Sequence, residues 1–107
     1  MQKKLKILKE LKTLLVENFG GNIKDVILFG SRAGKASSKN SDFDILVILN
    51  NDYDWKYKKR IIEVSFEIDL KYEILTDIKI ISAAELGNSV KGLHPLYEEA
   101  INQGIYA

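Results

Sequence analysis

The strongest constraint on the fold is a run of five consecutive apolar residues, Ile45 to Leu49, within the segment 42–50. Side chains alternate between the two faces of a β-strand, so a strand with this run is apolar on both faces. Such strands occupy central positions in sheets that are covered on both sides. The sequence therefore predicts that 42–50 is the central strand of a sheet.

Two long segments show the three- and four-residue apolar spacing of amphipathic helices. The first helix is expected at 3–18, and the glycines at 20 and 21 end it. The second is expected at about 54–70, with Asp52 or Asp54 as its cap. Its inner stripe is expected to contain Ile61, Val64, Ser65 and Ile68.

Short apolar runs predict two further strands, at 25–29 and 72–82. Ser82 and Glu85 have the spacing of a capping box, so a short helix should follow them. A last helix is expected at about 95–103. The order is therefore α-β-(turn)-β-α-β-α-α, which predicts an α/β or α+β fold with a small mixed sheet of three main strands flanked by helices.

Charge and composition limit the classes of partner. Sixteen basic and fifteen acidic residues leave a formal charge of +1, so no overall charge attracts nucleic acid or a membrane surface. There are no cysteines, which excludes disulfides and thiolate metal sites. No apolar run approaches the ~20 residues of a membrane span, and the N-terminus lacks a signal-peptide core. We expect one cytoplasmic domain over 1–107.

Two aspartates stand at the start of the predicted central strand. Asp42 and Asp44 lie two residues apart, which places them on one face with their Cα atoms ~6.5 Å apart. Two carboxylates this close repel unless a positive charge lies between them, and a hard cation such as Mg²⁺ suits them. An isolated pair of this kind more often ends a loop or caps a turn. The pair alone leaves both interpretations open.

A glycine and a serine follow the strand that precedes this pair. Gly30 lets backbone N–H groups approach an anion closely, and Ser31 adds a hydroxyl at the start of an expected helical turn and loop over 31–41. Arg32 or Lys35 could add positive charge. On its own, a glycine–serine pair most often forms only a tight turn.

The two features together resemble a known signature. Gly30-Ser31, ten intervening residues and Asp42-x-Asp44, set between two strong strands, resemble the motif of the nucleotidyltransferase superfamily that includes DNA polymerase β. The chain is most similar to the minimal, single-domain members, and the resemblance covers essentially all of it. One departure is present: those members often read Gly-Ser-Arg-Ala-Arg-Gly, whereas this chain has Gly34 and Lys35 at the last two places.

The resemblance implies transfer of a nucleoside monophosphate, AMP from ATP, to a hydroxyl with release of pyrophosphate. It implies two Mg²⁺ ions held by Asp42 and Asp44, and a third carboxylate on a neighbouring strand. Asp77 fits this third place, because a lone carboxylate inside an apolar run would be costly to bury without a partner. Glu67 and Asp69 compete with it, but they fall near a helix end where a solvated position explains them.

The resemblance also implies a phosphate site. Gly30 and Ser31 would bind the β- and γ-phosphates, and Arg32 and Lys35 would supply charge nearby. Lys35 offers a point charge in place of the bidentate fork of an arginine.

Minimal members often pair with a helical protein of the HEPN type, in some cases as antitoxin and toxin. In those pairs the transferase adds AMP to a tyrosine of its partner, and this is the role that the resemblance favours. The alternative is a non-catalytic antitoxin that keeps the fold and occludes its partner. A DNA-binding regulator ranks last, because the basic stretch 52–60 is better explained as a helix start with solvated lysines.

Overall fold

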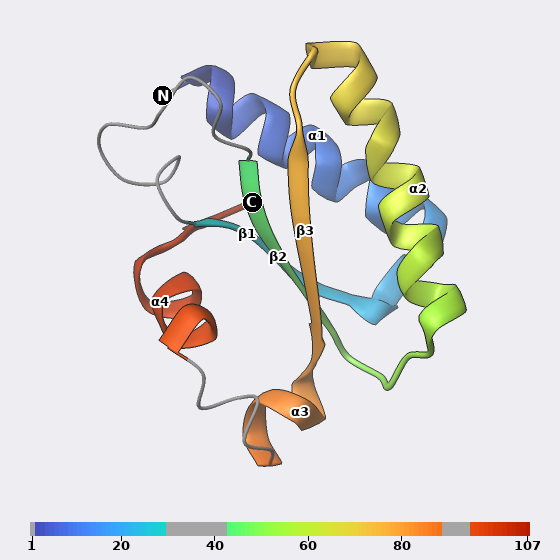
Figure 1. The fold of residues 1–107 in the computed structure, drawn as a ribbon, viewed down its shortest axis with the longest axis vertical. Coiled ribbons are helices and arrows are strands. Elements are labelled where there is room, and N and C mark those ends of the chain that lie inside the picture. Colours follow the sequence, from blue (N-terminus) through green and yellow to red (C-terminus); the bar gives the residue numbers. More distant parts are fainter. Residues whose placement is uncertain (1, 30–42, 89–94) are drawn as a thin grey trace.

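The computed structural model describes residues 2–29, 43–88 and 95–107, which form four strands and the helices around them (Figure 1). No helix within these ranges is long and apolar enough to cross a membrane. In chain order the elements are α1 (Gln2–Phe19), the 3₁₀ helix η1 (Gly20–Asn22), β1 (Ile23–Phe29), β2 (Phe43–Leu49), α2 (Trp55–Tyr72), β3 (Thr76–Ser82), α3 (Ala83–Asn88), α4 (Pro95–Gln103) and β4 (Ile105–Tyr106).

The strands form one mixed sheet in the order β3-β2-β1-β4. β2 lies between an antiparallel neighbour, β1, and a parallel one, β3, and α2 makes the crossover between the two parallel strands. The predicted mixed sheet with a central 42–50 strand is therefore confirmed. β4 adds a short fourth strand, antiparallel to β1, beyond the three main strands that were predicted.

The two faces of the sheet are covered by different helices. On the first, the α1/α2 face, strand residues such as Val26, Ile45 and Val47 pack with buried residues of α1 and α2. On the second face, which we call the α4 face, Leu46 and Ile48 of β2 pack with other buried residues. These are Ile27 of β1, Ile81 of β3 and Ala100 of α4. Figure 1 shows α1 and α2 together on one side and α4 on the other. The five apolar residues of β2 alternate between these two cores, as their position in the sequence requires.

The predicted capping residues stand where α2 and α3 begin. Of the two candidates at the start of α2, Asp54 is the cap: its side chain accepts a hydrogen bond of 2.9 Å from the backbone N–H of Tyr57. Ser82 and Glu85 form the expected capping box, with reciprocal hydrogen bonds of 3.0 and 3.1 Å. The predicted inner stripe of α2 is buried at Ile61, Ser65 and Ile68 and half-buried at Val64.

Candidate active site

Two carboxylates meet where the parallel strands begin. Asp44 on β2 is the register partner of Asp77 on β3, and Asp44 also lies opposite Phe29 on β1. Register partners in neighbouring strands project from the same face, about 4.8 Å apart along the hydrogen-bonding direction. Because Phe29 belongs to the core of the α4 face, both aspartates lie on that face. The fold therefore brings together two carboxylates that are far apart in the sequence.

Lys79 completes this group. Its Nζ lies 3.2 and 3.3 Å from the two carboxylate oxygens of Asp77. The exposed fractions of the two side chains are 41% for Lys79 and 42% for Asp77, so the ion pair is open to solvent. The apolar surroundings of Asp77 in the sequence predict a buried carboxylate, but in the structure Asp77 is half-exposed and has a lysine partner. Lys79 was missed, although its two-residue spacing predicts that it shares a face with Asp77.

The competing acidic residues lie elsewhere. Glu67 is exposed on α2, as a solvated position predicts. Asp69 near the end of α2 is half-buried, and its Oδ1 accepts a 2.7 Å hydrogen bond from the hydroxyl of Thr76, so it anchors the start of β3. α2 packs on the α1/α2 face, opposite Asp44. Of the three candidates, the structure brings only Asp77 beside Asp44.

The remaining predicted site residues, Gly30, Ser31, Arg32, Lys35 and Asp42, lie outside the described residues. The residues that flank their segment in the chain are described. Phe29 ends β1 opposite Asp44, and Phe43 begins β2 one residue before it. Both flanks of 30–42 therefore lie at the end of the sheet that carries Asp44 and Asp77.

The donor atoms of this group suit a hard divalent cation. The described part of the site offers carboxylate oxygens, the ligands that Mg²⁺ prefers. Within residues 2–29, 43–88 and 95–107 no three acidic, histidine or cysteine side chains gather closely enough to hold a metal. Asp44 and Asp77 thus account for two carboxylates, and a third carboxylate beside them would have to come from outside the described ranges.

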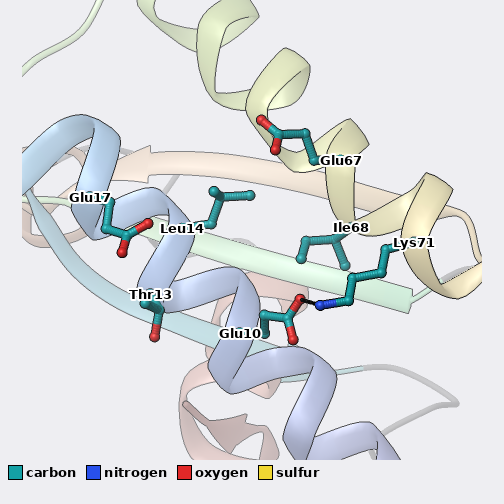
Figure 2. Close-up of a pocket in the computed structure, with 7 residues that line it drawn as sticks. All are labelled: Glu10, Thr13, Leu14, Glu17, Glu67, Ile68 and Lys71. Carbon is teal, nitrogen blue, oxygen red and sulfur yellow. Dashed lines mark hydrogen bonds and ion pairs between the residues drawn. The ribbon is translucent and has the colours of Figure 1, made fainter.

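A groove on the opposite side of the sheet has a structural role. It has a volume of about 240 Å³ and lies between α1 and α2, which contribute Glu10, Thr13, Leu14, Glu17, Glu67, Ile68 and Lys71 (Figure 2). Glu10 forms an ion pair of 2.8 Å with Lys71 and accepts a 2.7 Å hydrogen bond from the hydroxyl of Tyr72. These contacts join the middle of α1 to the last turn of α2.

This junction makes stability depend on pH. Hydrogen bonds from Lys71 and Tyr72 lower the pKa of Glu10 below its ordinary 4.5, and Glu10 raises the pKa of Lys71. A lowered carboxyl pKa contributes stability that is present above about pH 4.5 and is lost as the pH falls through the folded-state value. Glu10→Gln should therefore lower the free energy of unfolding at pH 7, and the difference from wild type should shrink as the pH falls below about 4.5.

Urea unfolding between pH 7 and pH 3 measures this difference. Glu17→Gln is the matched control, because Glu17 lines the same groove but forms no ion pair within the described residues. A Glu10→Gln difference that stays constant across this pH range would contradict the account.

Comparison with known proteins places the chain in a family. The model of the polymerase β nucleotidyltransferase family matches residues 9–104. Two proteins of Methanocaldococcus jannaschii, named "Putative protein adenylyltransferase" MJ0604 and MJ0141, are each 34% identical to the chain. These matches cover 78% and 66% of the chain, and 77% and 72% of the relatives.

Solved structures share the fold. A doubly substituted variant of the toxin–antitoxin complex MntA–HepT matches with a TM-score of 0.64 and 18% identity, over 92% of this chain and 69% of that one. The MntA–HepT complex itself matches with a TM-score of 0.56 and 19% identity, over 95% of this chain and 69% of that one. On the family match and the two relatives, the chain belongs to the polymerase β nucleotidyltransferase family.

Proposed function

We propose that this chain is a metal-dependent nucleotidyltransferase that moves AMP from ATP to a hydroxyl group of a partner protein. The observation that carries the proposal is the pairing of Asp44 with Asp77 on neighbouring parallel strands, on the face of the sheet away from α1 and α2. Family membership supports nucleotidyl transfer in general. The names of the relatives, protein adenylyltransferases, support AMP as the group and protein as the acceptor.

Asp44 and Asp77, together with Asp42, would hold the cation. When bound, Mg²⁺ would neutralise charge on the phosphate oxygens and lower the pKa of the acceptor hydroxyl. Asp77 would either hold the ion that activates that hydroxyl or accept its proton, while the hydroxyl oxygen forms a bond to the α-phosphorus. The bond between the α-phosphorus and the bridging oxygen would break, and pyrophosphate would leave with the electron pair. Lys79 would lie beside Asp77 as its ion-pair partner.

Gly30 and Ser31 would bind the β- and γ-phosphates through backbone N–H groups and the serine hydroxyl, with Arg32 and Lys35 supplying charge. The position of the flanking residues supports this assignment, because Phe29 and Phe43 lie on neighbouring strands beside Asp44. Phosphates bound by the segment between them would lie next to the proposed metal site.

The proposed partner is a small helical protein of the HEPN type, and its acceptor is a tyrosine. The structural neighbours support this pairing because they were solved as MntA–HepT toxin–antitoxin complexes. The chain would act as one cytoplasmic domain over 1–107, in an antitoxin role.

A second candidate is a binding protein that occludes its partner without catalysis. Gly34 and Lys35 favour it, because they replace the arginine–glycine that minimal members often carry in the phosphate-binding turn. Loss of a bidentate arginine weakens phosphate binding more than it affects the metal ligands.

Incubation with α-labelled ATP, Mg²⁺ and the candidate partner separates the two functions. The enzyme should label the partner and release pyrophosphate, and both products should disappear with Asp42→Ala or when a chelator removes the metal. A stable complex with no label at saturating ATP and Mg²⁺ would identify the occluding protein and contradict the enzyme.

A further inference from the structure

The outer face of α2 carries a line of exposed apolar side chains. The exposed fractions are 68% for Trp55, 44% for Ile62, 54% for Phe66 and 66% for Leu70. Their spacing of seven, four and four residues places them along one side of the helix, and we call them the outer stripe. The inner stripe already packs against the sheet, so α2 is apolar on two sides. A row of exposed apolar side chains along one side of a helix is typical of an interaction surface.

The charges of α2 are segregated along its length. The first six residues contain Lys56, Lys58, Lys59 and Arg60, and the later part contains Glu63, Glu67 and Asp69. Apart from Asp54 at the N-cap and Lys71 in the last turn, this distribution opposes the helix dipole, which favours acidic residues at the N-terminus and basic ones at the C-terminus. The first turn has no acidic residue. The stability of α2 itself therefore does not explain its charge pattern.

The charges nearest the outer stripe have no ion-pair partner among the described residues, although Lys56 Nζ lies 5.9 Å from the ring centroid of Trp55 and Arg60 Cζ lies 5.8 Å from that of Phe19. These charges belong to Lys56, Arg60, Glu63 and Glu67. All four are exposed. On a helix they follow one another along a single border of the outer stripe, because their positions differ by three or four residues.

We propose that the outer stripe is the contact surface between two copies of this chain, with their α2 helices antiparallel about a twofold axis near Ile62. In this arrangement Trp55 lies opposite Leu70 of the second copy, and Phe66 lies opposite the aliphatic stem of Lys59. The same centre brings Lys56 opposite Glu67 of the second copy and Arg60 opposite Glu63. The apolar pairs and the charged pairs thus have centres one residue apart, on either side of Ile62.

A second copy matches the pattern better than nucleic acid does. A self-complementary patch is what an isologous dimer requires, since each contact occurs twice. Nucleic acid would meet the basic half of α2 but be repelled by its acidic half. The dimer would leave Asp44 and Asp77 accessible, because they lie on the opposite face of the sheet.

Sedimentation velocity of the full chain over roughly 1 to 300 µM tests the proposal. The wild type should show a monomer–dimer equilibrium, and Phe66→Asp should raise the dissociation constant at least about tenfold. Phe66 is exposed, so circular dichroism should show an intact fold. Val16→Asp, which alters an exposed apolar residue of α1, should leave the dissociation constant unchanged.

A charge exchange tests the antiparallel register. Lys56→Glu and Glu67→Lys should each weaken dimerisation, because each homodimer then contains two like-charge contacts. Mixing the two variants should restore dimers, since both contacts are then between opposite charges. A monomeric wild type over the whole range, a dimer insensitive to Phe66→Asp, or no recovery on mixing would each overturn the proposal.

Discussion

Replacing Asp44 with asparagine is expected to lower the rate of nucleotide transfer by about 10²–10³-fold without unfolding the protein. Asparagine has the shape of aspartate but lacks its negative charge, so a cation held between Asp44 and Asp77 would lose one anionic ligand. Single-turnover transfer from α-labelled ATP measures the effect. The same substitution should weaken Mn²⁺ binding, which a titration followed by electron spin resonance detects without any turnover.

Asp52→Asn is the matched control for this variant. Asp52 is exposed in the connection between β2 and α2, at the opposite end of β2 from Asp44. The control removes the same charge outside the proposed site, so its transfer rate and Mn²⁺ affinity should equal those of the wild type. Equal rates for both variants and the wild type would remove Asp44 from the catalytic site.

Replacing Gly104 with alanine is expected to cost about 1–3 kcal/mol of the free energy of unfolding. An added Cβ would overlap the backbone oxygen of Ala100 and the side chain of Ile27, and it would lie 2.9 Å from the backbone oxygen of Leu28. Two of these atoms are backbone, so the turn between α4 and β4 must move away from β1. Urea denaturation measures the change.

Gly87→Ala is the control, because nothing lies within 4 Å of a Cβ at Gly87 and this residue is in α3. Alanine there should be neutral or should stabilise by up to about 1 kcal/mol, since it has the higher helix propensity. If Gly104→Ala were as stable as Gly87→Ala, the close approach of β1 to this turn would be wrong.

Local signals predicted most of the fold. The apolar run from Ile45 to Leu49 predicted the central strand. The Ser82–Glu85 box predicted where α3 begins, and the start of α2 was narrowed to a cap at Asp52 or Asp54, of which the structure selects Asp54. β4 escaped prediction because two residues cannot show periodicity. Its pairing depends on the turn at Gly104, which returns the chain to β1.

The candidate site was only partly predictable. The sequence places Asp44 at the start of one strand and Asp77 inside the strand predicted at 72–82, which begins only at Thr76 in the structure because α2 continues to Tyr72. The relative register of the two strands depends on how α2 packs across the sheet. That register is a tertiary property, and it makes the two aspartates direct partners. In the sequence, Asp77 is preferred to Glu67 and Asp69 as the third carboxylate because its neighbours are apolar. In the structure, Asp77 is preferred because it is the register partner of Asp44. The roles of the residues in 30–42 stay predictions.

Crystals of the full chain soaked with Mn²⁺ and a non-hydrolysable ATP analogue test the proposed metal site most directly. We predict an anomalous peak between the carboxylates of Asp44 and Asp77, at about 2.0–2.6 Å from their oxygens, with triphosphate density beside it. Bound nucleotide with no Mn²⁺ at Asp44 and Asp77 under saturating conditions would contradict the proposal that these aspartates form a catalytic metal site.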